Sequence, residues 1–243
     1  MSDSTTETMK VGIWQVLPMV APSLRAILER IPMPAVENIE EIRIRRGRPL
    51  AVRCQHEEWF LSKKGELLST PESAYSVTSD DLVKTLQLVC QGSLYAYEEE
   101  LRQGFITLPG GHRVGIAGKA ILDGGILKTL CEISSLNIRI ARAVPGAAQK
   151  LLPFILDFRE KRPYHTLIVS PPGAGKTTIL RDLVRSLSYG LPSLNLPGLS
   201  VGVVDERSEL AACFQGIPQH DLGPRVDVLD CCPKALGMIM LLR

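Results

Sequence analysis

The amino-terminal half of the chain mixes helical and strand-like hydrophobic patterns. Apolar residues recur every three or four positions in 24–31 and again in 79–90, which predicts two amphipathic helices, the second behind a Ser/Asp cap. Alternating residues in 41–45, and apolar runs on either side of the turn at 109–111, predict strands joined by tight turns. The alternating run 136–141 predicts a further strand. These elements indicate an α+β unit.

The carboxyl-terminal half has a different order of elements. In sequence they are an apolar helix over 151–158, a buried strand over 166–169, a glycine-rich loop, a helix with one apolar face over 179–187, and a buried strand over 201–204. A run of buried strands separated by helices is typical of a mostly parallel sheet. We therefore expect a domain boundary near Pro145, with an α+β domain in residues 1–145 and an α/β core in 146–243.

The loop between the strand 166–169 and the next helix reads SPPGAGKTT. It matches the phosphate-loop (Walker A) pattern GxxxxGK[ST], except that Ser170 stands at the first glycine position. Glycines in such a loop let backbone N–H groups approach a di- or triphosphate at the positive end of the helix. We therefore expect cofactor contacts from the whole loop: Ser170, Pro171, Pro172, Gly173, Ala174, Gly175, Lys176, Thr177 and Thr178.

Two side chains of this loop have specific expected roles. Lys176 would reach the β- and γ-phosphates as a point charge, and the Thr177 hydroxyl would ligate Mg²⁺. The predicted cofactors are therefore ATP and Mg²⁺.

Acidic residues follow the strand 201–204 directly, at Asp205 and Glu206. Because the carboxyl ends of parallel strands form the ligand crevice, both should face the bound phosphates. Either Asp205 holds Mg²⁺ through water while Glu206 polarises the attacking water, or the acids serve as a general base and the Mg²⁺ carboxylate lies on a later strand. A cluster of acids that caps a helix is the alternative without catalysis.

Composition narrows the class of protein. The 243 residues are 45% hydrophobic and 22% charged, with a formal net charge of +2, so nothing indicates a strongly polyanionic partner. The six cysteines lack zinc-site spacing, and no apolar run approaches the ~20 residues of a membrane helix. His112 has no second His or Cys nearby, which predicts a loop residue and not a ligand or base. We expect a reduced cytoplasmic protein with at most peripheral membrane contact.

Longer motifs resemble the stage III sporulation protein AA family. They are EEIRIRRGRPL, GGHRVGIAGKAI, SSLNIRIAR, SPPGAGKTTILRDLVR, VGVVDERSEL and GIPQHDLGPRVDVLDCCPKALGMIMLLR, and together they run from about Glu40 to Arg243. The resemblance implies a mother-cell ATPase of endospore-forming bacteria, similar to the ring-forming ATPases of type II and type IV secretion. It also implies a P-loop NTPase core of the RecA/AAA kind.

The resemblance assigns further residues. Asp205 and Glu206 fall on the acidic box where the secretion ATPases keep their catalytic base. Arg139 and Arg142 match arginines that the amino-terminal domain can lend to the phosphates, and Arg225 is a weaker candidate for a phosphate or subunit contact. The family has a further segment with an Asp-Glu strand, so by resemblance we expect the core to be incomplete at its carboxyl end.

Together these features predict an Mg-ATP-binding ATPase whose full-length form hydrolyses ATP. By resemblance it would form a homo-oligomeric ring such as a hexamer, contact membrane subunits, and energise a channel between mother cell and forespore. Two alternatives stay open: a nucleotide-gated structural module without turnover, and a nucleic-acid-dependent RecA-like NTPase. Nucleic acid is the less expected partner because no aromatic residues interleave with the arginines of 41–48.

Overall fold

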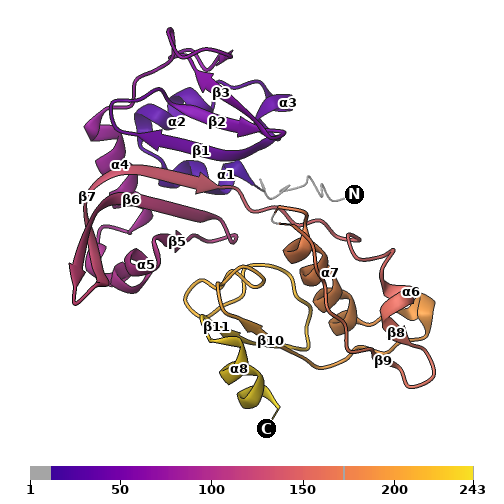
Figure 1. Ribbon diagram of the computed structural model, residues 1–243. Helices are drawn as coiled ribbons and strands as arrows, with labels where there is room; N and C mark the ends of the chain where they lie inside the picture. Colours follow the sequence, from indigo (N-terminus) through magenta and orange to yellow (C-terminus); the bar gives the residue numbers. More distant parts are fainter. Residues whose placement is uncertain (1–11, 172, 243) are drawn as a thin grey trace, which may run out of the picture. The chain divides into compact units, whose positions relative to one another are not determined.

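The structure is a computed structural model that describes residues 12–171 and 173–242. The chain divides into two compact units, Met1–Ala141 and Arg142–Arg243 (Figure 1). This division falls a few residues before Pro145, where the hydrophobic pattern predicts the boundary. Pro172, one of the expected phosphate-loop residues, lies outside the described residues.

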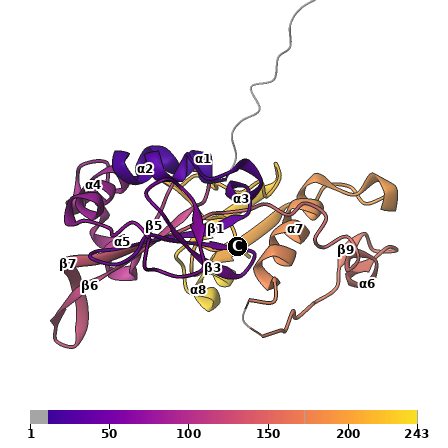
Figure 2. The ribbon, with the colours of Figure 1, turned by 90° about the horizontal axis from the view of Figure 1, so that it is seen from above.

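Unit 1 combines helices with one antiparallel sheet. Its helices are α1 (Ile13–Val16), η1 (Leu17–Met19), α2 (Pro22–Leu28), α3 (Met33–Val36), α4 (Ser79–Val89), η2 (Leu94–Tyr97) and α5 (Glu98–Gln103). Its strands are β1 (Ile39–Arg45), β2 (Ala51–Cys54), β3 (Glu57–Leu61), β4 (Leu67–Leu68), β5 (Phe105–Thr107), β6 (Arg113–Asp123) and β7 (Ile126–Arg139). Among the described residues the strand order is β4-β3-β2-β1-β7-β6-β5. Figure 2 shows α1, α2 and α4 along one side of this sheet.

The strands predicted in the amino-terminal half form, and their alternation sets the register. Ile42 of β1 pairs with Val52 on one side and with Ile138 on the other, and all three are buried. The next residue, Arg43, projects to the opposite face, where it forms ion pairs with Glu41 and Glu58. A shift by one residue would bury the arginines, so the apolar alternation holds the pairing in place.

Helix α4 begins with a reciprocal cap. The Thr78 hydroxyl accepts the backbone N–H of Asp81 at 3.1 Å, and the Asp81 carboxylate accepts the backbone N–H of Thr78 at 2.9 Å. The cap is therefore Thr78, one residue before the predicted Ser79, and the helix 79–90 predicted from spacing runs over Ser79–Val89. Such a capping box satisfies two N–H groups at the start of the helix.

His112 lies in the turn between β5 and β6, as expected, but its side chain is buried. The backbone N–H of Ala141 donates to Nδ1 at 3.0 Å, so Nε2 carries the proton and donates to Gln15 Oε1 at 2.9 Å. Burial lowers the pKa of His112 to about 4. The ring is therefore a neutral structural link between the start and the end of unit 1.

This burial predicts an acid-sensitive unit 1. Because the pKa of His112 is about 4 in the folded protein and its ordinary value is 6.5, the neutral ring stabilises the fold fully above pH 6.5 and loses that effect as the pH falls towards 4. We expect the free energy of unfolding to drop by about 2 kcal/mol between pH 7 and pH 5 from this residue alone. Urea titrations followed by tryptophan fluorescence measure it, since Trp14 and Trp59 both lie in unit 1.

His112→Gln is the control for that titration. The variant loses stability at pH 7 but should lack the histidine-dependent part of the drop. An equal drop in both proteins would contradict the assignment.

Unit 2 has short elements around one long helix. They are α6 (Leu152–Ile155), β8 (Leu156–Asp157), β9 (Arg162–Pro163), α7 (Lys176–Tyr189), η3 (Pro192–Leu194), β10 (Val201–Asp205), β11 (Val226–Asp230) and α8 (Lys234–Leu241). β10 and β11 pair in parallel, with Asp205 beside Asp230. The predicted strand 201–204 and the helix after the loop are thus present.

Two predictions for unit 2 are wrong. The helix expected over 151–158 is only the single turn α6, after which the chain becomes extended in β8. The strand expected over 166–169 is absent, and Leu167 and Val169 are 85% and 78% exposed. A strand needs neighbours for its N–H and C=O groups, and among the described residues β10 pairs with β11 and not with this segment.

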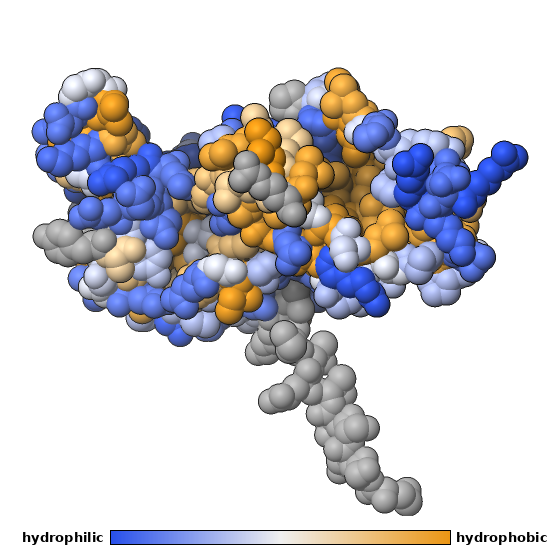
Figure 3. All heavy atoms as spheres, turned by 90° about the horizontal axis from the view of Figure 1, so that it is seen from below, coloured by the Kyte–Doolittle hydropathy of each residue, from blue (hydrophilic) through white to orange (hydrophobic). Residues whose placement is uncertain are grey.

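Helix α8 packs on β10 through its glycine and leaves apolar side chains exposed. A Cβ at Gly237 would collide with Val204, so only glycine allows this close approach. Leu236, Met238 and Ile239 are each more than half exposed. α8 lies at the lower edge of unit 2 in Figure 1, and Figure 3, seen from below, shows apolar side chains gathered there. Within residues 12–171 and 173–242, no helix has the length and apolar character needed to cross a membrane.

Candidate functional site

The phosphate loop ends at the start of α7, where the N-cap residue is a glycine and makes no side-chain cap. Gly175 is the N-cap of α7, in the left-handed conformation with φ 85°, and Gly173 also has a positive φ of 76°. Residues with a Cβ rarely adopt this conformation, which explains both glycines. The first-turn N–H groups of a helix have no partners within the helix, and here no side chain of the cap residue accepts from them. This end of α7 is therefore suited to an anion.

Lys176 folds back over the loop. Its ammonium donates to the carbonyl oxygens of Ser170 at 2.7 Å and Pro171 at 2.9 Å, and to Ser170 Oγ at 3.2 Å. Ser170, which replaces the first glycine of the pattern, thus contributes its carbonyl and hydroxyl to holding the lysine. The acceptors that the described part of the chain gives this ammonium are neutral oxygens, and none is a carboxylate.

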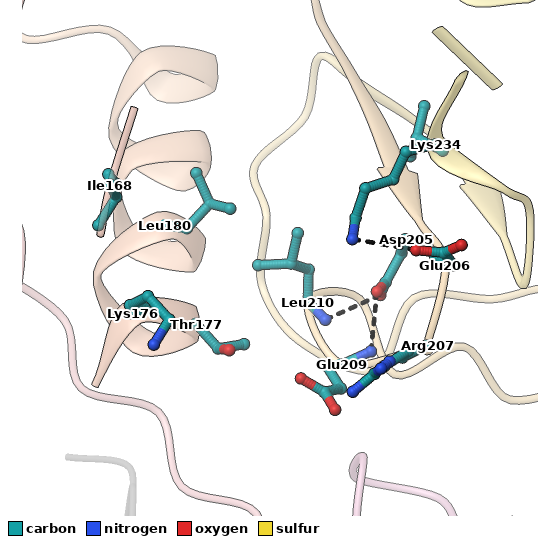
Figure 4. A pocket seen from close by; sticks show the side chains of 11 residues that line it. Ile168, Lys176, Thr177, Leu180, Asp205, Glu206, Arg207, Glu209, Leu210 and Lys234 are labelled. Carbon is teal, nitrogen blue, oxygen red and sulfur yellow. Dashed lines mark hydrogen bonds and ion pairs between the residues drawn. The ribbon is translucent and has the colours of Figure 1, made fainter. Parts of the chain in front are cut away.

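The two threonines of the loop face different surroundings. Thr177 lines a pocket of about 230 Å³ whose opposite wall comes from the end of β10 and the loop after it. Thr178 lines a separate pocket with Arg181 and the segment 143–145. Figure 4 shows the Thr177 side chain reaching from the first turn of α7 towards the wall that carries Asp205 and Glu209. The structure thus brings Thr177, and not Thr178, into one pocket with the predicted acids.

Asp205 is buried and both of its oxygens are engaged by backbone groups. Oδ1 accepts the N–H of Glu209 at 2.9 Å, and Oδ2 accepts the N–H groups of Leu210 at 2.8 Å and Ala211 at 2.9 Å. This carboxylate therefore shapes the segment 206–211, which we name the acidic loop. The arrangement resembles the capping alternative considered for this residue, although no helix follows.

Glu206 is an exposed acid of the pocket, as is Glu209. The Oε2 atom of Glu206 lies 3.0 Å from Lys234 Nζ, with side chains 41% and 68% exposed. An ion pair this exposed contributes little to stability, because water screens both charges. Glu206 is therefore free to rearrange towards a bound ligand at small cost.

Arg181 joins the helix of the phosphate loop to the acidic loop. From α7, its Nε donates to the Leu210 carbonyl at 2.9 Å and its Nη2 to the Glu209 carbonyl at 2.7 Å. Burial lowers the pKa of this guanidinium, and the charge of Asp205 acts in the opposite direction. Sequence reasoning missed this contact because nothing in the α7 pattern distinguishes Arg181 from a solvated helix residue.

The arginines assigned by resemblance occupy other places. Arg139 lies on β7 in unit 1, with Nε 3.7 Å from Glu41 Oε2, and Arg142 is an exposed residue at the start of unit 2. Their contacts with a nucleotide stay a prediction. Arg225 donates from Nη1 to the Ser188 carbonyl at 2.9 Å, which is a contact inside unit 2.

β11 is the element that sequence reasoning missed. The run Val226–Asp230 is a second strand after β10, and it too ends in Asp. The β-branched residues of VDVLD were the available signal. Burial raises the pKa of Asp230, a hydrogen bond from Ser208 opposes this, and the charge of Asp205 adds to it.

Comparison with known proteins identifies the family. The family described as sporulation stage III, protein AA, matches residues 10–243. The chain belongs to this family. The stage III sporulation protein AA of Bacillus subtilis (strain 168) is 43% identical over 231 residues, covering 95% of this chain and 69% of that protein. The family resemblance seen in the motifs is thereby confirmed.

Solved structures with weaker similarity are secretion and motor proteins. The Legionella pneumophila ATPase DotB matches with a TM-score of 0.40 and 15% identity over 79% of this chain and 47% of its own. The pilus retraction motor PilT, solved with ADP, gives 0.36 and 16% over 71% and 44%. The VirB11 ATPase of the Brucella suis type IV secretion system, solved with sulphate, gives 0.28 and 16% over 90% and 67%. The chain spans less than half of the DotB and PilT chains, so their activities are only proposals for this sporulation protein AA family member.

Proposed function

We propose that unit 2 binds ATP with Mg²⁺ at residues 170–178 and hydrolyses it. The observation that carries the proposal is the start of α7, where two left-handed glycines, uncapped N–H groups and the Lys176 ammonium occur together. N–H groups and a cation directed at one point are the features that recognise a polyphosphate.

The side chains of the pocket suit Mg²⁺ carried in by the nucleotide. Mg²⁺ usually keeps several waters and takes one or two protein oxygens together with substrate phosphates. Thr177 offers a hydroxyl, and Glu206 and Glu209 offer carboxylates from the opposite wall. Within the described residues no group of three or more His, Cys, Asp or Glu is arranged as a metal cage. When bound, Mg²⁺ would neutralise charge between the β- and γ-phosphates.

Each of four residues would have a separate role in ATP binding and hydrolysis. Lys176 holds the β- and γ-phosphates, and Thr177 ligates Mg²⁺. Glu206 is the general base that accepts a proton from the attacking water, since it is the acid of the pair Asp205 and Glu206 that is exposed to the pocket. Asp205 supports the acidic loop through its three backbone bonds, in place of the Mg²⁺ contact considered for it.

A second candidate function is nucleotide-gated binding without turnover. It is favoured by one observation, the ion pair between Glu206 and Lys234, which occupies the carboxylate that would act as base. Binding of Mg-ATP in that case would change the conformation of unit 2 without cleaving the γ-phosphate.

Titration with a fluorescent ATP analogue tests both candidates. We expect saturable binding that unlabelled ATP displaces and that weakens at least about 10-fold when EDTA removes Mg²⁺, because the metal neutralises phosphate charge. Phosphate release measured on the same sample separates the two: steady turnover supports the ATPase, and binding alone supports the gated module. No displacement by ATP would contradict both.

We further propose that the family member works as a homo-oligomer, a ring such as a hexamer, together with membrane subunits of a sporulation channel, at the cytoplasmic face of the mother-cell membrane. The exposed apolar side chains of α8 support an assembled form, because soluble monomers rarely expose adjacent large apolar residues. Light scattering with and without Mg-ATP would measure the assembly, and a monomer under all conditions would contradict it.

A further inference from the structure

A polar link at the back of the acidic loop is not used by the proposed chemistry. Asp230, at the end of β11, lies beside Asp205 in the parallel pair. Its Oδ2 accepts the Ser208 hydroxyl at 3.1 Å, and its Oδ1 is buried with no hydrogen-bond partner among the described residues. Asp230 does not line the pocket of Figure 4, whereas Glu206, two residues before Ser208, does.

This link is costly to the fold in two ways. A carboxylate with a buried oxygen that lacks a donor is unfavourable, and the neighbouring charge of Asp205 makes it more so. Ser208 itself is buried and has φ 50°, a left-handed conformation that is unfavourable for a residue with a Cβ. Such costs persist where the surroundings force them and often mark functional sites. Stability alone would favour asparagine at position 230.

Within residues 12–171 and 173–242, no lysine, arginine or histidine is among the main groups that act on the charge of Asp230. The groups that face it are Asp205 from β10, Ser208, Cys231, whose Sγ lies 3.7 Å from Oδ2, and Cys213. Burial, reinforced by Asp230 and Asp205, raises the pKa of Cys213 to about 11, so this thiol is neutral at pH 7. Three donors lower the pKa of Asp230: the Ser208 hydroxyl, which has the largest effect, and the thiol and backbone N–H of Cys231.

Three residues form hydrogen bonds with the acidic loop. Asp205 binds the N–H groups of its second half, Arg181 binds the carbonyls of Glu209 and Leu210, and Asp230 binds Ser208. Asp205 and Arg181 bind residues 209–211, which follow Ser208 in the chain, whereas Glu206 precedes Ser208. Ser208 is thus an anchored residue two positions after Glu206.

We propose that Asp230 is a positioning residue that, through the Ser208 hydroxyl, holds the Glu206 end of the acidic loop in the orientation needed to activate water. This inference rests on the proposed function of the same site. Neither residue needs to touch the nucleotide, and a displacement of Glu206 by about 1 Å is enough to reduce turnover 10²-fold.

Four variants test the link: Ser208→Ala, Asp230→Ala, Asp230→Asn, and Ser200→Ala as a control at an exposed serine outside the site. Hydrogen exchange of residues 206–211 is measured without nucleotide, followed by kcat, KM and the dissociation constant of the ATP analogue. We expect Ser208→Ala and Asp230→Ala to exchange at least about 10-fold faster in this segment and to lose about 10- to 100-fold in kcat, with nucleotide affinity within about 2-fold of the parent.

Asp230→Asn distinguishes the link from a general structural role. Its side-chain oxygen still accepts the Ser208 hydroxyl, so exchange and kcat should stay near the parental values. Its thermal midpoint at pH 7 should rise by roughly 2–4 °C because the unfavourable charge is gone. If Asp230→Asn lost as much kcat as Asp230→Ala, or Ser208→Ala kept parental exchange and kcat, the proposal would be overturned.

These measurements distinguish a failure of ATP binding from a failure of the Asp230 anchor. If the parent binds no ATP, the proposed function is wrong, and unchanged exchange in Ser208→Ala would separately refute the anchor. If the parent binds ATP without turnover, the positioning role is refuted even where exchange reveals an anchored loop. Should Asp230→Ala not fold, Ser208→Ala and Asp230→Asn still decide the question.

Discussion

Lys176→Ala is expected to weaken Mg-ATP binding by about 10- to 100-fold. The lysine is the cation that the loop holds beside the uncapped start of α7, and a hydrogen bond to a charged group contributes about 1.5–3 kcal/mol. The loss should appear in the dissociation constant of a fluorescent ATP analogue. Affinity equal to that of the parent would refute the phosphate-loop assignment.

Lys176 also donates to the carbonyls of Ser170 and Pro171, so its substitution could change the conformation of the loop. Two further variants control for this effect. Lys176→Met keeps the length of the side chain and removes only the charge and the donors. Lys150→Ala removes an equal charge from an exposed position in unit 2. We expect Lys176→Met to bind as weakly as Lys176→Ala, and Lys150→Ala to bind like the parent with an unchanged thermal midpoint.

Glu206→Gln is expected to keep ATP binding and to lower turnover by roughly 10² or more, the scale of a positioned general base. The glutamine is nearly isosteric but cannot accept the proton of the attacking water. Only the exposed ion pair with Lys234 is lost, so the free energy of unfolding should change little. Single-turnover phosphate release at saturating Mg-ATP measures the chemical step directly.

Asp205→Asn is the informative comparison, because Asp205 holds backbone groups whereas Glu206 is exposed. Asparagine has one acceptor oxygen where Asp205 uses two for three backbone N–H groups, so we expect a lower thermal midpoint as well as lower turnover. Glu160→Gln, at an exposed turn of unit 2, should leave both unchanged. Parental turnover in Glu206→Gln would show that the acid is structural.

Features that are determined by residues adjacent in sequence could be predicted from the sequence alone. The alternation of 41–45 and 136–141 predicted strands, because side chains two residues apart share one face of a sheet, so each run has one apolar face. The glycines, lysine and threonine of residues 173–177 specified a loop with left-handed positions ahead of a helix, since those conformations are set residue by residue. The family could be recognised for the same reason, from continuous motifs.

Features that depend on partners distant in sequence were decided by the tertiary structure. The apolar run 166–169 has the composition of a buried strand yet lies exposed, because a strand exists only where another strand accepts its hydrogen bonds. His112 is a buried link because Gln15 and Ala141 reach it. Asp205 and Glu206 are adjacent in sequence, yet one faces three backbone N–H groups and the other faces the pocket. Which acid is supported and which is available to a ligand depends on where the chain returns after β10, and spacing along the sequence does not contain that information.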